Sequence, residues 1–335
     1  MPMYQDILKM NVQILIFNVQ TISLIIGIVL LSLIVLFLIF FFVAGIFFFN
    51  VCFKRKDLTK YYENNGKGMD ETVKLTDDKE FIESHEFDEV FIEANDGIKL
   101  AANVLKSKNN SHKYVIFFHG FRGTVLPEWS SLIHLFYDYN YNIFVVHERG
   151  NWDSGGKYFT MGPKEKDDLV SWVNYVASID KNSKICLFGH SMGAHIVLLG
   201  VGDNLKDNVK CAIADCGYAD LDEQFIHTAK EMLHLKFSKI LVKVGEMYCK
   251  IFYKMHFDET TIKALSRCKT PVCLIHGTAD KFVPYDNLKK NYDAITTNVY
   301  KEKHTFEGAA HCSSESKDPE KFYKIIDKFI SKFIK

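Results

Sequence analysis

The distribution of apolar side chains divides the chain into two unequal parts. Between Lys9 and Lys54 the sequence carries no charged residue, and residues 22–49 are almost entirely Ile, Leu, Val and Phe. About 20 such residues, folded as a helix, cross a bilayer core of about 30 Å. A cleavable signal peptide has a shorter apolar run behind a basic start. The pattern therefore predicts an uncleaved transmembrane anchor at residues 21–50, preceded by an N-terminal flank at residues 1–20.

The charges on either side of the anchor predict its orientation. Lys9 alone precedes the apolar run, whereas Lys54, Arg55, Lys56 and Lys60 follow it closely. Positively charged flanks of a membrane span stay on the cytoplasmic side. We therefore expect a single-pass protein of the cell membrane whose large domain faces the cytoplasm. Its expected partner is the lipid bilayer, contacted through the N-terminal helix, and no obligate protein partner is evident.

The pattern changes after the anchor. Residues 51–86 are basic and polar, and we interpret them as a tether. Beyond them, Asn95-Asp96-Gly97 lies between two β-rich runs, residues 90–93 and 99–105, which is a strong hairpin signal. A soluble domain is therefore expected at residues 87–335, and it opens with an antiparallel pair of strands.

The rest of the domain alternates between short apolar runs and segments of helical periodicity. Strands that are apolar on both faces belong to a parallel sheet covered by helices on either side. We therefore predict an α/β fold with a doubly wound, mostly parallel sheet. The segment of about residues 218–268 is too long for one crossover helix and is interpreted as an inserted helical cap. The expected strands are residues 114–118, 143–146, 185–188, 209–214 and 272–275, and the expected helices are residues 127–139, 163–179, 194–202 and 319–334.

Composition excludes several classes of function. The 335 residues include 41 basic and 41 acidic side chains, so the chain has no charge excess that would favour nucleic-acid binding. No HExxH motif, Walker loop or GxGxxG motif accompanies the predicted sheet, so metal hydrolysis, nucleotide hydrolysis and dinucleotide binding have no support. We therefore expect no cofactor, no metal site and no nucleic-acid partner.

The segment Gly189-His190-Ser191-Met192-Gly193 directly follows a predicted strand and precedes an apolar helix. This is the context of a nucleophile elbow, in which the serine hydroxyl stands exposed above the sheet. Glycines on either side allow the strand and the helix to approach closely. We predict Ser191 as a nucleophile, and a turn with an idle serine is the alternative.

A serine hydroxyl becomes a nucleophile only with a base in hydrogen-bond reach, itself oriented by a third group. Asp280 lies in the loop immediately after the last apolar strand, and His311 lies among small residues before the final helix. The order Ser, Asp, His along the chain matches that of hydrolases with a nucleophile elbow. We predict Asp280 and His311 as these partners; Asp215 competes with Asp280, and His304 competes with His311.

Acyl transfer also requires donors for the developing oxyanion. The segment His119-Gly120-Phe121-Arg122-Gly123 follows the first predicted parallel strand. The backbone N–H groups of Phe121 and Met192 are the predicted donors. Arg122 is expected to be an exposed loop arginine, with an anionic head group as an alternative partner.

Together these motifs resemble the α/β-hydrolase superfamily, and within it the single-span, membrane-anchored serine hydrolases related to the α/β-hydrolase-domain esterases and acyl-protein thioesterases. The resemblance implies Ser191 as nucleophile, His311 as base and then acid, and Asp280 as its orienting partner. It also implies an oxyanion hole formed by the amides of Phe121 and Met192. Haloalkane dehalogenases and epoxide hydrolases of this fold instead place Asp at the position of Ser191. The motifs are HGFRG (119–123), ERGNWDSGG (148–156), GHSMG (189–193), DCGY (215–218), HGTADKFVP (276–284) and GAAH (308–311).

The expected reaction is two-step hydrolysis of a carboxylic ester or thioester through an acyl-serine intermediate. An apolar cap and a bilayer anchor favour an acyl or lipid-derived substrate. A membrane-tethered serine peptidase of the same fold is one alternative, because the three predicted residues do not distinguish an amide from an ester. A non-catalytic membrane scaffold is another, although a scaffold has no need for Ser191, Asp280 and His311.

Overall fold

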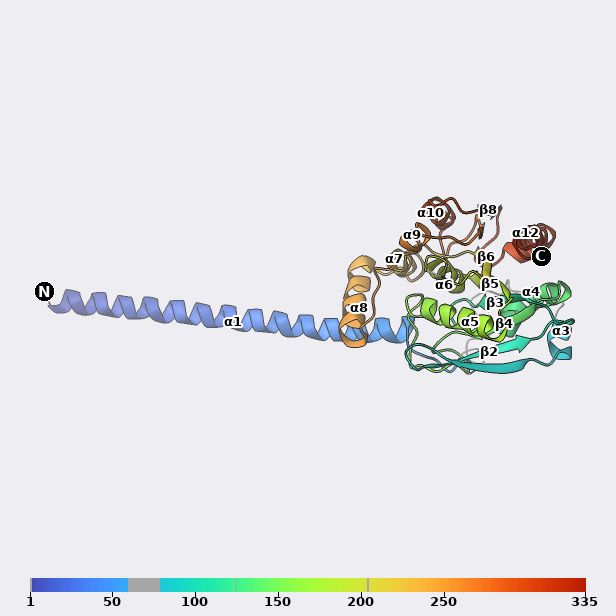
Figure 1. The fold of residues 1–335 in the computed structure, drawn as a ribbon. Helices are drawn as coiled ribbons and strands as arrows, with labels where there is room; N and C mark the ends of the chain where they lie inside the picture. The colour runs from blue at the N-terminus through green and yellow to red at the C-terminus, as the bar shows by residue number, and fades with distance from the viewer. Residues whose placement is uncertain (1, 60–78, 124, 204) are drawn as a thin grey trace.

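The structure is a computed structural model that describes residues 2–59, 79–123, 125–203 and 205–335. It consists of an α/β domain from which helix α1 (Pro2–Cys52) projects (Figure 1). The helix has 51 residues, or about 76 Å at a rise of 1.5 Å per residue. The predicted flank and anchor are therefore parts of one continuous helix. Within the described residues, α1 is the one helix long and apolar enough to cross a membrane.

One eight-stranded sheet in the order β1-β2-β4-β3-β5-β6-β7-β8 forms the centre of the domain. β1 pairs antiparallel with β2, which pairs antiparallel with β4, and all remaining neighbours are parallel. Gly97 in the β1–β2 turn has a φ of 78°, which costs glycine little. The predicted fold class is confirmed. The strands are β1 (Asp88–Glu93), β2 (Lys99–Leu105), β3 (Lys113–Phe118), β4 (Asn142–His147), β5 (Lys184–His190), β6 (Val209–Asp215), β7 (Val272–Gly277) and β8 (Lys301–Phe306).

Both faces of the sheet are covered, because alternate residues of a strand point to opposite sides. In β3, Val115 and Phe117 join a core cluster with α4 and α12, whereas Ile116 and Phe118 join the cluster with α5 and α6. This arrangement explains why the central strands are apolar on both faces. The helices outside the cap are α3 (Lys79–Ser84), α4 (Leu126–Asp138), α5 (Glu165–Ile179), α6 (Met192–Gly200), α10 (Asp286–Ala294), α11 (Ser314–Lys317) and α12 (Pro319–Phe333).

The segment between β6 and β7 is helical, as expected for a cap. It contains α7 (Leu221–His227), the π-helical turn η1 (Thr228–Met232), α8 (Ser238–Tyr253) and α9 (Thr261–Leu265). In Figure 1, α8 runs across the C-terminal part of α1 rather than alongside it.

The last turns of α1 pack against α8, and we call this contact the α1–cap junction, formed by residues 41–53 and α8. A Cβ added to Gly45 would lie 2.2 Å from Cγ of Tyr248, and one added to Gly245 would lie 2.3 Å from Cγ of Phe48. Each helix thus provides a glycine on which an aromatic ring of the other helix rests. The backbones approach closely because neither glycine carries a side chain.

The described parts of the expected tether contact the domain, and residues 60–78 lie outside the described residues. Phe53 and Leu58 are buried. The guanidinium of Arg55 donates to the carbonyl oxygens of Trp152 and Ser154, at 2.5 and 2.6 Å. Residues 53–58 are therefore packed on the domain, which a polar composition alone does not indicate.

Candidate active site

Ser191 occupies a strained turn between β5 and α6. Its backbone has φ 52° and ψ −112°, outside the favoured regions for a residue with a side chain. A Cβ on Gly193 would lie 1.8 Å from the carbonyl oxygen of Phe118, and one on Gly189 would lie 2.3 Å from the carbonyl carbon of Gly193. The two glycines of the motif are therefore required by the close approach of β3, β5 and α6.

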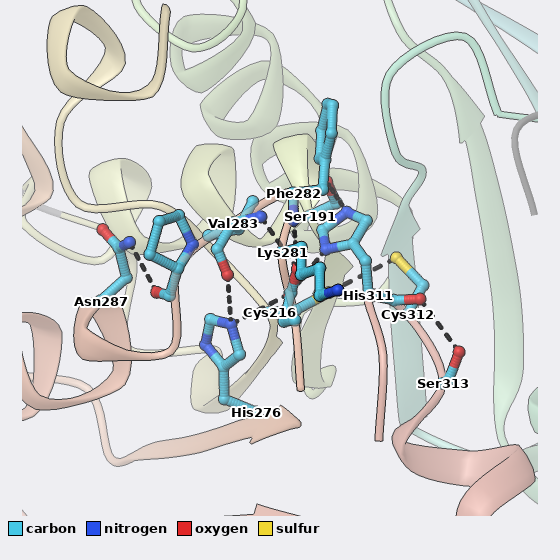
Figure 2. A network of polar contacts seen from close by, with 12 residues as sticks. Ser191, Cys216, His276, Lys281, Phe282, Val283, Asn287, His311, Cys312 and Ser313 are labelled. Carbon is cyan, nitrogen blue, oxygen red and sulfur yellow. Dashed lines mark hydrogen bonds and ion pairs between the residues drawn. The ribbon is translucent and has the colours of Figure 1, made fainter. Parts of the chain in front are cut away.

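The structure brings Ser191, His311 and Asp280 together from three separate loops, and Figure 2 shows the ring of His311 beside Ser191. Nε2 of His311 lies 2.8 Å from Oγ of Ser191, and Nδ1 of His311 lies 2.7 Å from Oδ2 of Asp280. The loops follow β5, β8 and β7, which end at the same edge of the sheet. The imidazole is thus placed to accept the hydroxyl proton while the carboxylate orients it.

Asp280 is itself held by a network of donors. The backbone N–H groups of Phe282 and Val283 both donate to Oδ1 at 2.9 Å. Nε2 of His276 lies 3.1 Å from Oδ2 and also 3.1 Å from the carbonyl oxygen of Val283. The sequence gives His276 no role within its motif, because only the fold turns its ring toward Asp280 and toward Val283 (Figure 2).

This network sets the charges of the pair. Burial raises the pKa of Asp280, but hydrogen bonds from His276 and His311 outweigh burial and lower the pKa to about 2. Burial lowers the pKa of His311, whereas its contact with Cys216 and then its hydrogen bond to Asp280 and the charge of that carboxylate raise it, and the net pKa lies well above the ordinary value. Asp280 is therefore ionised at neutral pH, and the raised pKa of His311 favours its protonated form beside that carboxylate.

The competing residues make other contacts. Asp215 is buried and accepts a hydrogen bond from Oγ of Ser314 at 3.1 Å, and burial raises its pKa to about 7. His304 lies on β8, where its Nε2 is 3.0 Å from Oε1 of Glu302. The hydrogen bonds therefore place Asp280 and His311, rather than these two competitors, beside Ser191.

The predicted oxyanion donors belong to two segments that lie close to Ser191. Met192 begins α6 directly after the serine, and a Cβ on Gly120 would lie 3.7 Å from Cβ of Ser191, so the loop with Phe121 passes close to it. In the part of the chain that the structure describes, neither the N–H of Phe121 nor that of Met192 donates to a protein acceptor. Both groups are therefore available to an oxygen of a substrate.

The loop that carries Phe121 is braced from two sides. The N–H of Gly120 donates to Oε1 of Glu128 at 2.9 Å, and Nε1 of Trp152 donates to the carbonyl oxygen of Gly123 at 2.7 Å. These contacts fix the loop relative to α4 and to the loop after β4. Buried polar contacts of this kind hold a site in one conformation.

The expectation that Arg122 is exposed is wrong. The side chain is only 7% exposed, and its guanidinium donates to the carbonyl oxygen of Val51 at 2.9 Å. This carbonyl lies in the last turn of α1, where unsatisfied backbone oxygens and the helix dipole favour a cation. The sequence could not indicate this contact, because it requires the end of α1 to lie beside a loop about 70 residues further along the chain.

A pair of cysteines borders the histidine and was not predicted. Sγ of Cys216 lies 3.4 Å from Sγ of Cys312, which follows His311. Burial raises the pKa of Cys216 well above its usual range, so the thiol stays protonated. Ligand atoms of these three residues lie within 4.8 Å of one another. Both nitrogens of His311 already contact Ser191 and Asp280, so a metal bound there would break those hydrogen bonds.

Comparison with known proteins identifies related sequences. The model of the prolyl oligopeptidase family matches residues 127–335, which include Ser191, Asp280 and His311. The uncharacterised protein YqkD of Bacillus subtilis is 28% identical over 222 residues, which cover 64% of this chain and 70% of that protein. The uncharacterised protein YfhR of Escherichia coli K12 is 27% identical over 208 residues, which cover 59% of this chain and 65% of that protein.

Solved structures with this fold include esterases and a peptidase. The esterase Pf2001 of Pyrococcus furiosus superposes with a TM-score of 0.60 at 25% identity, over 75% of this chain and 94% of that one. Est1E of Butyrivibrio proteoclasticus, solved with ferulic acid, has a TM-score of 0.57 at 21% identity, over 73% and 99%. The acylaminoacyl peptidase of Pyrococcus horikoshii has a TM-score of 0.56 at 17% identity, over 75% and 42%.

Proposed function

Because the chain belongs to the prolyl oligopeptidase family within the α/β-hydrolase superfamily, we propose that it is a membrane-anchored serine hydrolase of carboxylic esters or thioesters. The observation that carries this proposal is the continuous hydrogen-bonded series Ser191, His311 and Asp280. The N–H groups of Phe121 and Met192, which have no acceptor among the described residues, belong to segments close to the serine and support the proposal.

The proposed reaction begins when Oγ of Ser191 attacks the substrate carbonyl carbon and its proton passes to Nε2 of His311. The carbonyl oxygen becomes an oxyanion that accepts hydrogen bonds from the N–H groups of Phe121 and Met192. Asp280 remains ionised and stabilises the imidazolium. The carbon–oxygen or carbon–sulfur bond then breaks, the alcohol or thiol takes the proton from His311, and an acyl-serine remains.

Water completes the cycle. His311 accepts a proton from a water molecule that attacks the acyl carbonyl, and the second oxyanion uses the same two amides. Collapse of this intermediate breaks the bond to Oγ of Ser191, which regains its proton from His311. The products are a carboxylic acid and the restored enzyme, so no cofactor is required by the proposed steps.

Acyl or lipid-derived esters are the proposed substrate class. An apolar helix of 51 residues ends against the cap, and an enzyme inserted in a bilayer meets lipophilic substrates at high local concentration. The similarity to the esterase Pf2001 supports an ester rather than an amide. The ring of Phe282, 5.0 Å from that of His311, adds an aromatic surface beside the reacting groups.

A serine peptidase is the second candidate, favoured by the family match. The same three residues cleave amides when the site accommodates a peptide. Purified protein is offered a series of acyl esters and thioesters, from acetyl to octanoyl and longer, beside a library of short peptides. Faster cleavage of the longer esters supports the proposal, whereas a preference for acetyl esters contradicts the lipid assignment and a preference for peptides favours the second candidate.

Labelling by a fluorophosphonate probe tests the chemistry directly. The full chain in detergent is expected to react with the probe, and Ser191→Ala is expected to lose both labelling and turnover. Ser178→Ala is the matched control, because Ser178 is an exposed serine on α5 that hydrogen-bonds only locally, to the carbonyl oxygen of Tyr175. A wild-type protein that remains unlabelled and inactive would favour a non-catalytic scaffold.

Membrane insertion is part of the proposal. The uncharged run between Lys9 and Lys54 supports a span by α1, and the basic residues after it support a cytoplasmic domain. Membranes washed with alkaline carbonate are expected to retain the full chain. Protease added outside intact cells is expected to leave the domain uncleaved. Release by carbonate would contradict insertion, and cleavage from outside would contradict the orientation.

A further inference from the structure

α8 carries an apolar stripe that faces away from the domain. Ile240, Met247 and Ile251 share one side of the helix by their spacing and are 59%, 42% and 59% exposed. Val242 and Cys249 occupy the opposite side and are buried in the core, and Val244, at the edge of the stripe by its spacing, is buried as well. An apolar stripe of this kind on a helix at the edge of a domain needs an apolar partner.

A basic stripe flanks the apolar one. Lys239, Lys243, Lys250 and Lys254 follow each other at helical spacing and are exposed. Lys243 forms ion pairs with Asp222 and Glu246, at 2.7 and 2.9 Å. The other three lysines form no ion pair among the described residues. Apolar side chains bordered by unpaired lysines are the pattern of a helix that lies in the surface of an anionic membrane.

α1 borders the apolar stripe on its other side. The rings of Phe42 and Phe252 lie 5.7 Å apart, so the exposed apolar surfaces of α1 and α8 are continuous. Because α8 runs across α1, a helix α1 that spans the bilayer places α8 roughly along the membrane plane (Figure 1).

The position of α8 along α1 also agrees with the thickness of a bilayer. Phe41 is the first residue of α1 to be buried, and the side chains from Met3 to Phe40 are exposed. The 19 residues from Ile22 to Phe40 correspond to about 29 Å of helix, the thickness of a hydrocarbon core. The exposed part of α1 is therefore long enough to hold a hydrocarbon core that ends at the α1–cap junction.

We propose that this side of α8 is a second membrane-contact surface, seated on the leaflet that the domain faces. The α8 membrane face consists of Ile240, Met247 and Ile251, which enter the boundary of the acyl region, and Lys239, Lys250 and Lys254, which meet anionic phospholipid head groups. The inference rests on the proposed insertion of α1. Because α1 and the α8 membrane face would both contact the bilayer, the orientation of the domain relative to the membrane would be fixed.

The lysines favour a membrane over a second copy of the chain. A symmetric contact of this face with itself would bring the basic stripes of two protomers together, and like charges at a contact are repulsive. Anionic phospholipids, enriched in cytoplasmic leaflets, supply the complementary charge.

The test uses tryptophan fluorescence of the full chain in vesicles of phosphatidylcholine with about 30 mol% phosphatidylserine. Vesicles with and without brominated acyl chains are compared, and the emission of the wild-type chain is subtracted. In Ile251→Trp, the brominated chains are expected to quench most of the fluorescence that the new tryptophan adds. Leu31→Trp, in the middle of α1, reports insertion, and Ile179→Trp, exposed at the end of α5, is expected to be unaffected.

The three positions separate failure of this inference from failure of anchoring. Quenching of Leu31→Trp without quenching of Ile251→Trp overturns the α8 membrane face and leaves the anchor intact. Absence of quenching at both positions overturns insertion itself. If bromine does not quench the fluorescence of Ile251→Trp, but its emission changes with the protein-to-lipid ratio, the α8 membrane face contacts a second copy of the chain instead.

The lysines are tested separately. Lys239→Gln with Lys250→Gln is expected to reduce the quenching of Ile251→Trp in anionic vesicles. Replacement of Lys328 and Lys332 on α12 by Gln is the matched control and should leave quenching unchanged. Equal quenching in the α8 variant and its control would contradict the proposal that these lysines bind anionic lipid. Unchanged cleavage of a short soluble ester verifies that each variant is folded.

Discussion

The active-site edge and the α1–cap junction are built on different principles. At the active-site edge, polar groups at the ends of neighbouring strands meet through hydrogen bonds of defined direction, as between His311 and Ser191. At the junction, aromatic rings rest on glycines, and Phe49 stacks on Tyr253 with ring centroids 3.7 Å apart. A directional site can therefore be encoded by short motifs, whereas a packed junction depends on the shapes of two distant segments.

The two regions should also respond differently to substitution. Removal of a reacting group at the active-site edge abolishes a chemical step without removing packing. Removal or addition of atoms at the junction changes packing energy, by about 1–3 kcal/mol when a site is overfilled. Substitutions in the two regions are therefore expected to separate turnover from stability.

The largest expected effect is that of His311→Ala. Loss of the base lowers kcat by about a millionfold if the three residues act as a unit. Turnover of a short ester and reaction with a fluorophosphonate probe measure this effect. His304→Ala, on the neighbouring strand, is the matched control and should remain active. A comparable loss in the control would show that the competing histidine has the catalytic role.

The next largest effect is expected for Asp280→Asn, at about ten thousandfold in kcat. The pH profile adds a second measurement, because activity requires neutral His311 and is lost as pH falls through the pKa of this histidine. Since Cys216 and Asp280 both raise that pKa, the wild-type midpoint should lie above the ordinary value, and Asp280→Asn, which removes the contribution of the carboxylate, should move it to lower pH. A midpoint that stays in place would contradict the proposed pairing.

Arg122→Ala is expected to have an intermediate effect, because Arg122 connects the two regions. Its charged hydrogen bond to Val51 is worth about 1.5–3 kcal/mol, so kcat should fall by about ten- to a hundredfold at most. Arg267→Ala is the matched control, since Arg267 donates to the carbonyl oxygen of Lys263 at the end of α9. Equal turnover of both variants would show that the end of α1 does not influence the oxyanion loop.

The smallest effect on catalysis is expected for Gly45→Ala. The new methyl group would overlap the ring of Tyr248, so unfolding of the domain in detergent should begin at lower temperature, by about 1–3 kcal/mol of stability. Gly27→Ala in the same helix has no atom within 4 Å and should leave the transition unchanged. Turnover of a short soluble ester should be retained in both. An equal shift in the two variants would contradict the packing of the junction.

Much of the active-site edge was predictable because parallel strands end on one side of a sheet. Ser191, Asp280 and His311 each follow a strand, so their convergence required only the strand assignments and the motifs. The roles of His276 and of the Cys216–Cys312 pair were not predictable. Their contacts depend on side-chain directions within loops, which short patterns do not specify.

The sequence by itself determined the elements and their chemistry. Periodicity predicted the central strands, the crossover helices and the long apolar helix, since each of these signals comes from residues that are neighbours along the chain. The elbow was readable for the same reason, because Gly189 and Gly193 lie within two residues of Ser191.

Only the tertiary structure decided which residues the C-terminal end of α1 contacts. Burial of Arg122, the reciprocal contacts of Gly45 and Gly245, and the packed segment 53–58 all join residues that are distant in the chain. Such contacts follow from complementary shape and unsatisfied backbone groups at the place where two elements meet. Neither property is visible until both elements are positioned in space.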